Sequence, residues 1–224
     1  MGTDLGGRSR AKRGSEKSHG PSTNAPYGDR VCNSCTESNH KACQGGLMGR
    51  SRYKVYNTEK LHFFTCTIVQ WIPLFSDPHL LEIIVDSFSF LQKEKRLQLY
   101  AYVIMKDHIH FIASANNLSK EVGDFKSFTA RQIIDLLKQQ KSIDLLRLLE
   151  VCKVRHKIDR QYQVWQEGSH PQEIISERMM TQKLNYIHNN PVRRGYVQRP
   201  IDWPYSSARD YHGEEGLLKV ITDW

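Results

Sequence analysis

The spacing of apolar residues becomes regular shortly after residue 50 and predicts the first half of a folded domain. Residues 61–72 (LHFFTCTIVQWI) are rich in β-branched and aromatic side chains, which favours a strand. Residues 79–95 repeat apolar side chains at helical spacing. Residues 97–105 and 108–114 again have strand composition, and the intervening Lys106-Asp107 predicts a two-residue hairpin turn. The pattern therefore predicts strand, helix, strand, strand.

The second half of the chain continues with mostly helical periods. The expected elements are two amphipathic helices, a strand and a third helix, at residues 125–140, 143–156, 160–168 and 176–190. Ser176 is the expected N-cap of the last helix, and Pro191 is expected to follow its end. The order βαββααβα predicts an α+β fold, with a ferredoxin-like or RRM-like antiparallel sheet and helices packed mainly on one face.

Residues 1–50 show neither a strand nor a helix period and are rich in Gly, Ser, Arg and Lys. We predict a disordered basic leader at 1–50, a domain at 51–212 and a C-terminal tail at 213–224. The leader contains four soft metal ligands within twelve residues, which could hold zinc: Cys32, Cys35, His40 and Cys43. The alternative is a leader that is not native, because Met48 would make a natural start.

Composition limits the class of protein and suggests its partner. The chain has 39% hydrophobic and 25% charged residues, and no apolar stretch approaches the roughly 20 residues that span a bilayer. Its five cysteines are an odd number, and Cys66 and Cys152 stand alone in apolar patterns, which argues against a disulfide framework. The net charge of +8 favours an anionic partner such as nucleic acid. We expect a cytoplasmic, nucleoid-associated protein.

Two pairs of residues suggest chemistry. His108 and His110 are two apart in a predicted strand, so their imidazoles share a face. Tyr186 and Asn190 are four apart in a predicted helix and also share a face. Two imidazoles and an amide oxygen would leave open positions on Mg²⁺ or Mn²⁺ for water and phosphate. The plainer alternatives are two surface histidines on a sheet and a core tyrosine.

Other known sites do not match the pattern. A histidine-triad nucleotide hydrolase would need a third histidine at the position of Ile112. No His-Glu-x-x-His helix and no phosphate-binding loop of the ATPase type occurs in the sequence. A metal-dependent nucleotide hydrolase therefore remains only as a weaker alternative.

Four segments taken together resemble the motifs of the single-tyrosine HUH transposases: AYVIMKDHIHFI, VWQEGSHPQEI, LNYIHNNPVRRGYV and DWPYSSARDY. The closest resemblance is to the branch associated with bacterial repetitive extragenic palindromes, and it covers residues 51–212 in the family's motif order. The resemblance implies that His108, His110 and Asn190 bind the metal and that Tyr186 is the nucleophile. Family members often have Pro-Asn where this chain has Lys106-Asp107, and the insertion-sequence branch has glutamine where this chain has Asn190.

The resemblance also implies a reaction and a substrate. A metal-dependent endonuclease and strand transferase would cut single-stranded or hairpin DNA and form a 5′-phosphotyrosine, as a monomer or homodimer. A hairpin-binding descendant that no longer cuts DNA is the alternative. Trp165 is expected in the core rather than under a DNA base, and His188 is expected to face away from Tyr186. The expected phosphate contacts are Lys138, Lys141, Lys153, Arg155, Lys157, Arg193 and Arg194.

Overall fold

The computed structural model describes residues 60–224 of the chain. The expected leader at residues 1–50 and its four potential zinc ligands, Cys32, Cys35, His40 and Cys43, lie outside the described residues. No helix among residues 60–224 is both long enough and apolar enough to cross a bilayer.

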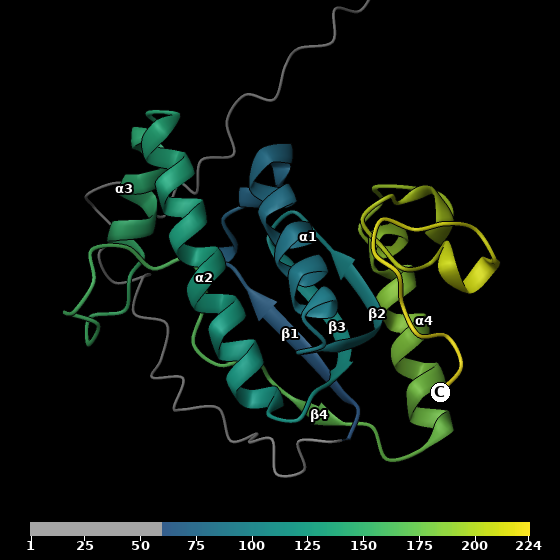
Figure 1. The fold of residues 1–224 in the computed structure, drawn as a ribbon. Helices are drawn as coiled ribbons and strands as arrows, with labels where there is room; N and C mark the ends of the chain where they lie inside the picture. The colour runs from purple at the N-terminus through teal and green to yellow at the C-terminus, as the bar shows by residue number, and fades with distance from the viewer. Residues whose placement is uncertain (1–59) are drawn as a thin grey trace, which may run out of the picture. The chain divides into compact units, whose positions relative to one another are not determined.

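The described residues form a four-stranded antiparallel sheet with helices, which confirms the predicted α+β class (Figure 1). The strand order is β2-β3-β1-β4. The strands are β1 His62–Thr67, β2 Gln98–Ile104, β3 His108–Ser114 and β4 Gln172–Glu173. Met105, Lys106 and Asp107 join β2 to β3. A backbone hydrogen bond from Met105 N to His108 O (2.8 Å) closes the hairpin around the expected turn residues Lys106 and Asp107. The register pairs Thr65 of β1 with His110 of β3, and this pairing becomes important at the site.

Four α-helices accompany the sheet: α1 Pro78–Lys93, α2 Leu118–Gln139, α3 Ile143–Val151 and α4 Glu177–Arg193. Short 3₁₀ turns occupy Val69–Trp71, Leu74–Ser76, Pro200–Asp202 and Asp210–His212. Asp77 caps α1 by accepting a hydrogen bond from the backbone of His79, and Ser176 caps α4 in the same way through Met179, as predicted. Figure 1 shows α1 and α2 lying across the sheet while α4 stands beyond the β2 edge in this view.

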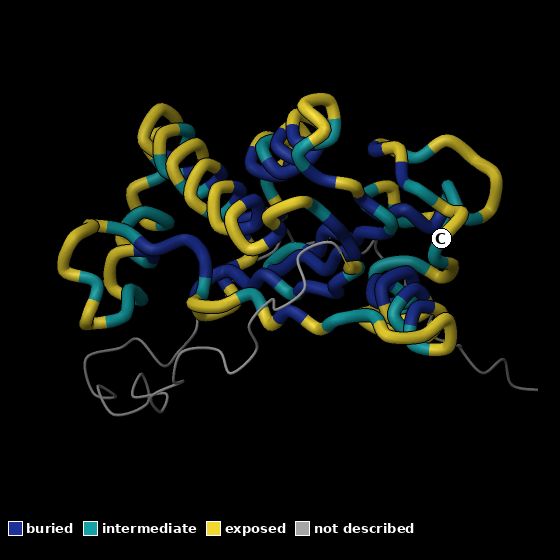
Figure 2. The backbone as a smooth tube through the Cα atoms, turned by 60° about the horizontal axis from the view of Figure 1, so that its bottom comes forward, coloured by how far each residue is buried: buried dark blue, intermediate teal, exposed yellow. Residues whose placement is uncertain are grey.

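The sheet buries both faces, because successive strand residues point in opposite directions. Phe64 and Phe111 pack on one face against Phe88 of α1 and Phe125 of α2, and the Phe88 and Phe125 ring centroids are 4.6 Å apart. The other face carries Phe63, Ala101, Val103, Met105 and Ile112, which pack with Met180, Leu184 and Ile187 of α4. The helices thus lie mainly on one face, and α4 covers the other. Figure 2 shows the resulting buried backbone at the centre and exposed turns around it.

The predicted strand at 160–168 is wrong, although this segment does follow the edge of β1. Only Trp165 forms an isolated bridge, to Ile68. Backbone hydrogen bonds from Thr65 to Ser169 (3.0 Å) and from Gln166 to Thr67 (2.8 Å) hold the segment in place. Positive φ angles of 75° at Gly168 and 43° at His170 interrupt a regular ladder. The paired residues of β4 therefore come later than predicted.

Several predicted ends also require correction. Strand β1 stops at Thr67 rather than continuing to residue 72, because the chain then enters 3₁₀ turns with positive φ at Gln70 and Trp71. Helix α2 begins at Leu118, seven residues before the predicted start, with Asn117 as its cap. Helix α3 ends at Val151 instead of residue 156.

Helix α4 continues past Pro191, which was expected to follow its end. Proline lacks an N–H donor, yet its carbonyl still accepts a hydrogen bond, here from Tyr196 at 2.9 Å. The helix ends where Gly195 adopts a left-handed φ of 70°, a conformation that costs glycine little.

The C-terminal residues cover the free edge of β2 rather than hanging away from the domain. Tyr205 and Ser207 exchange backbone hydrogen bonds with Ile104 and Tyr102 at 2.8 and 3.0 Å. Within the predicted tail at 213–224, Leu218 and Val220 are buried in the core beside α1 and β2. Packing therefore continues past residue 212. Cys66, a free thiol, is also buried in this core, and burial raises its pKa to about 11.

Candidate metal and tyrosine site

The two histidines lie side by side on the face of the sheet that α4 covers. His108 and His110 are 3% and 4% exposed, and their ring centroids are 4.7 Å apart. The alternative of two surface histidines is therefore wrong. Strand geometry accounts for the common direction, since residues two apart point to the same face. Burial needs tertiary cover, and part of it comes from Trp71, whose ring lies 5.6 Å from that of His108.

Each imidazole is held through its Nδ1 atom. His108 Nδ1 lies 2.5 Å from Asp107 Oδ1, and His110 Nδ1 lies 2.9 Å from Thr65 Oγ1. An ionised carboxylate can only accept a hydrogen bond, so His108 donates from Nδ1 and keeps the lone pair on Nε2. Such outer contacts fix the tautomer and the ring direction of metal-binding histidines. The carboxylate thereby sets His108 to offer Nε2, whereas the Thr65 hydroxyl can donate or accept and fixes only the direction of the His110 ring.

The free nitrogen of His110 is unusual. His110 Nε2 is buried and has no hydrogen-bond partner among residues 60–224. Buried polar atoms without partners are rare, because leaving them unpaired costs free energy. Burial, together with the positive charge of His108 when protonated, of Lys183 and of Arg194, lowers the pKa of His110 to about 3. The ring is therefore neutral at physiological pH, the state in which an imidazole can bind a metal ion.

Tyr186 stands beside this histidine on α4. Its ring centroid is 5.0 Å from that of His110 and 5.9 Å from that of Phe63. The side chain is 37% exposed, so Tyr186 is not a buried core aromatic. The ring of Phe63 on β1 also stacks on that of His110, with centroids 5.5 Å apart. Phe63 therefore packs against both the histidine of the sheet and the tyrosine of α4. The phenol remains open to a ligand from solvent while its ring is held in place.

Asn190 follows Tyr186 by four residues on α4 and is buried. Within residues 60–224, no cluster of three or more His, Cys, Asp or Glu could hold a metal ion. Asn190 lies on the side of α4 that carries Tyr186, and its amide oxygen could serve as a third ligand beside the two histidines. The buried, unpartnered Nε2 and the neutral nitrogen and oxygen donors fit a small divalent cation such as Mg²⁺ or Mn²⁺.

The predicted phosphate contacts fall into two groups. Arg193 and Arg194 end α4 next to the site, and Arg193 Cζ lies 5.5 Å from the centroid of the Tyr186 ring. The others lie near the end of α2, between α2 and α3, or in the segment after α3: Lys138, Lys141, Lys153, Arg155 and Lys157. This second group lies on the side of the sheet that α1 and α2 cover, away from the histidines.

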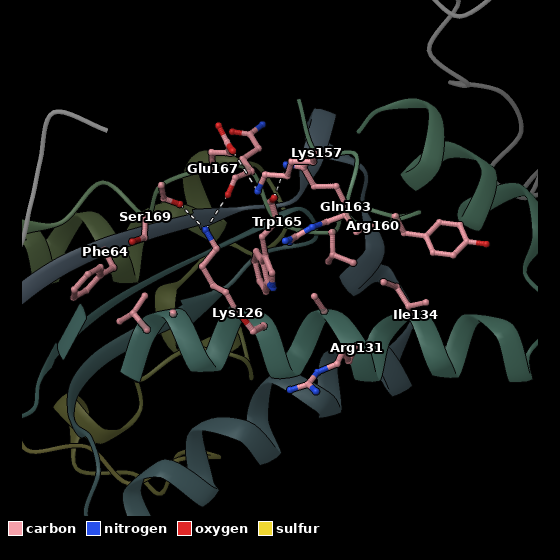
Figure 3. A pocket seen from close by; sticks show the side chains of 18 of the residues that line it. Phe64, Lys126, Arg131, Ile134, Lys157, Arg160, Gln163, Trp165, Glu167 and Ser169 are labelled. Atoms are coloured by element: carbon pink, nitrogen blue, oxygen red, sulfur yellow. Dashed lines mark hydrogen bonds and ion pairs between the residues drawn. The ribbon is translucent and has the colours of Figure 1, made fainter. Parts of the chain in front are cut away.

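A cleft of about 990 Å³ lies between α2 and the segment 157–171 (Figure 3). Three of the four cations that line it, all except Arg131, are matched by acceptors of the same cleft. Lys157 pairs with Glu167 at 3.2 Å, Arg160 pairs with Asp159 at 2.7 Å, and Lys126 donates to the Gln166 carbonyl at 2.8 Å. Trp165 is buried here and donates to Thr129, which confirms its expected place in the core. The cleft is thus a partly neutralised surface away from Tyr186.

His188 faces away from Tyr186, as predicted. Its Nε2 atom lies 3.0 Å from Ser207 Oγ, and its ring lies 5.1 Å from that of Tyr211. Burial and the neighbouring His212 lower the pKa of His188 to about 4. It therefore binds α4 to the segment along β2 and does not touch the nucleophile.

Sequence reasoning missed four residues of the site: Phe63, Thr65, Asp107 and Lys183. Asp107 adjoins His108, and Lys183 precedes Tyr186 by three residues on one helix, so both spacings carried a signal. Phe63 and Thr65 gave none, because β1 meets β3 only in the folded sheet, 45 residues away for Thr65 and His110.

Comparison with known families now becomes decisive. The family model described as "Transposase IS200 like" matches residues 55–190, more than half of the chain. The chain belongs to the IS200-like transposase family. This match agrees with the single-tyrosine HUH resemblance and includes both histidines, Tyr186 and Asn190.

Individual relatives point to the branch associated with repetitive extragenic palindromes (REP). A Haemophilus influenzae protein named as a REP-associated tyrosine transposase is 30% identical over 131 residues, covering 55% of this chain and 64% of the relative. The match thus spans less than two thirds of that relative's length. A solved structure titled as a REP-associated tyrosine transposase bound to a REP hairpin matches with a TM-score of 0.53 and 15% identity, covering 77% of this chain and 92% of that chain. At that identity the match supports the fold alone. A Deinococcus radiodurans protein named as a transposase matches with a TM-score of 0.35 and 21% identity, covering 63% of this chain and 97% of that chain.

Proposed function

We propose that the protein is a metal-dependent endonuclease and strand transferase that acts on single-stranded or hairpin DNA. The observation that carries this proposal is the contact of Tyr186 with His110, whose buried Nε2 atom has no partner among residues 60–224. Membership of the IS200-like family supports the same reaction class. The relative solved with a REP hairpin supports a structured single strand as the substrate.

The reaction is a transesterification. Tyr186 Oη attacks the scissile phosphorus and forms a P–O bond to tyrosine, while the bond from phosphorus to the 3′ oxygen breaks. The phenolic proton is lost, and the departing 3′ oxygen gains a proton to become a hydroxyl. Tyr186 is then joined to the 5′ phosphate of the downstream strand. Attack by another 3′ hydroxyl reverses the step and joins new ends, so the reaction needs no ATP.

The protein residues prepare this step before any bond changes. His108, His110 and Asn190 would hold Mg²⁺ or Mn²⁺, with Asp107 and Thr65 fixing the two rings. A divalent cation bound there supplies charge withdrawal from the phosphate. Phe63 keeps the Tyr186 ring beside His110. Arg193 and Arg194 contribute phosphate contacts that position the strand at Tyr186, and the cations around α3 would contact phosphates of the same DNA farther from the site.

A covalent-adduct assay tests the proposal. The protein is mixed with Mn²⁺ and a panel of 3′-labelled hairpins with single-stranded flanks, and denaturing electrophoresis then separates protein-linked DNA. The label belongs on the 3′ side because tyrosine retains the downstream fragment. We expect an adduct that requires the divalent ion. Hairpin binding with no adduct across the panel would instead support the binding-only alternative.

Tyr186→Phe provides the specific control. It removes one oxygen but keeps the ring contacts with Phe63 and His110, so binding and folding should persist. We expect the adduct rate to fall by more than about 1,000-fold, as it does when a covalent nucleophile is lost. An adduct that persisted in this variant would assign the nucleophile to another tyrosine, with Tyr162, Tyr205 and Tyr211 as candidates.

A further inference from the structure

Lys183 lies in the tyrosine site, although no sequence motif marked it. It precedes Tyr186 by one turn of α4, and its Nζ atom lies 4.3 Å from the centroid of the Phe63 ring. The same ring contacts both His110 and Tyr186. Lys183, the nucleophile and one predicted metal ligand therefore meet around a single phenylalanine.

The charge of Lys183 has no protein counterion within residues 60–224. Several lysines elsewhere, such as Lys60, Lys120 and Lys157, have a carboxylate oxygen within 4 Å, but Lys183 has no such ion pair among the described residues. Its side chain is half-buried, so water only partly replaces the missing anion. A cation over an aromatic face is stabilised by the ring, but this contact does not neutralise it. The arrangement suits an anion that arrives with a ligand.

The neighbouring groups define where that anion would sit. One side of α4 carries four residues at spacings of three, four and three: Lys183, Tyr186, Asn190 and Arg193. A cation thus stands on each side of the tyrosine along the helix. The Tyr186 ring also lies 5.0 Å from the ring of His110, between centroids, so the phenol stands between the histidine and the two cations. An oxyanion beside the phenol would meet positive charge on both sides.

We propose that Lys183 binds a non-bridging oxygen of the phosphate that Tyr186 attacks. This inference rests on the proposed function and adds a catalytic residue to it. Negative charge grows on the phosphate oxygens as the tyrosine oxygen approaches, and a fixed ammonium stabilises that charge without having to reorganise. The ammonium lies over the Phe63 ring, and this contact holds it near the position of the reacting phosphate.

The test compares Lys183→Met, Lys183→Arg and Arg178→Met in the full chain. Methionine keeps an apolar stem against Phe63 but removes the charge, and arginine restores a charge. Arg178 is an exposed cation on the same helix, five residues earlier and on a different side, so its variant controls for the loss of one positive charge. Thermal melting checks that all three variants fold.

The first readout is the adduct rate with Mn²⁺ at saturating concentrations of the hairpin that the parent cleaves fastest. Loss of one charge-stabilising donor commonly costs about 100- to 1,000-fold, and we expect Lys183→Met to lose about 100-fold. Lys183→Arg should stay within about 10-fold, and Arg178→Met within about 3-fold. The second readout is binding of a short single strand by the Tyr186→Phe protein across NaCl concentrations. Adding Lys183→Met should reduce the slope of log K against log[NaCl] by roughly 0.7.

The outcomes separate a phosphate contact by Lys183 from a purely structural role, and they separate failure of this inference from failure of the proposed function. If Lys183→Met cleaves as fast as Arg178→Met and keeps the parent salt slope, Lys183 does not contact phosphate. If methionine and arginine are equally damaging and both lower the melting temperature, the side chain serves packing and the inference fails. If the parent forms no adduct but the slope changes only with Lys183→Met, the proposed function fails while the phosphate contact remains.

Discussion

At the scale of single residues, the site depends on how each histidine ring is held. Asp107 and Thr65 both bind Nδ1, one from the adjoining turn and one from the neighbouring strand. The turn that contains Asp107 has its own support, because the Asp107 carbonyl accepts from Ile68 N at 2.9 Å. The carboxylate of Asp107 is therefore available for His108 and is not needed to form the hairpin.

Asp107→Asn should weaken metal binding without unfolding the protein. The amide oxygen can still accept from His108, but the negative charge beside the ring is lost. We expect the dissociation constant for Mn²⁺ to rise by about 10-fold, the usual scale for outer contacts of metal-binding histidines. Titration of free Mn²⁺ by electron paramagnetic resonance measures this directly.

Two further variants serve as the negative and positive controls for the effect of Asp107→Asn on Mn²⁺ binding. Asp86→Asn removes one negative charge from the exposed side of α1, across the sheet from the histidines, and should leave Mn²⁺ binding unchanged. His110→Ala removes a predicted ligand and should abolish Mn²⁺ binding and the adduct together. Equal Mn²⁺ affinities for Asp107→Asn and Asp86→Asn would show that Asp107 does not tune the site, and tight binding by His110→Ala would place the metal elsewhere.

At the scale of elements, α4 carries the nucleophile and must keep one rotation relative to the sheet. Its apolar side packs on Phe63, Val103 and Ile112, and a polar contact adds direction. His188 meets Ser207 Oγ, which also accepts from Tyr102 N at 3.0 Å. Ser207 thus joins the helix to the covered edge of β2. This contact lies on the side of α4 that faces away from Tyr186.

Ser207→Ala should destabilise the protein by about 1–3 kcal/mol, because it leaves His188 Nε2 and Tyr102 N buried without this partner. Urea unfolding followed by circular dichroism measures the change in free energy. Ser89→Ala, at an exposed position of α1, is the matched control and should stay within about 0.5 kcal/mol. A loss for Ser207→Ala as small as that of the control would mean that water replaces the hydroxyl at no cost.

At the scale of the whole molecule, the chain divides into a unit of residues 1–47 and a unit of residues 48–224. The family match at 55–190 and every residue placed in the tyrosine site belong to the second unit. The two groups of expected phosphate contacts also lie in it, at the end of α4 and around α3. Cleavage should therefore be a property of residues 48–224.

Deleting residues 1–47 should leave the adduct rate within a few-fold of the parent at low salt. The deleted segment shows no apolar period and lies outside the family match. Adduct formation by the shortened and parent proteins on the same hairpin measures the difference. A complete loss would return attention to zinc binding by Cys32, Cys35, His40 and Cys43, and zinc analysis of the parent would then follow.

Sequence alone determined the features that depend on local periodicity. Apolar spacing was sufficient for α1 and for the β2–β3 hairpin, because a helix or strand face repeats every few residues. The same reasoning placed His108 and His110 on one face and Tyr186 one turn before Asn190. The ends of the elements were predicted less accurately. Pro191 was expected to follow the end of α4, but the helix continues through it to Arg193 and stops before Gly195.

Only the tertiary structure decided what surrounds these residues. Local spacing cannot show that β1 pairs with β3. The contacts of Thr65 and Phe63 with His110 therefore could not be predicted. It also cannot state which face α4 covers. That choice brings Tyr186 to His110, whose buried Nε2 has no partner among residues 60–224. Segment 160–168 shows the same limit, since its apolar pattern suits a strand but in the folded domain only Trp165 forms a bridge, to Ile68. Contacts between distant segments exist only after the chain has paid the entropy of bringing them together, and no local pattern records them.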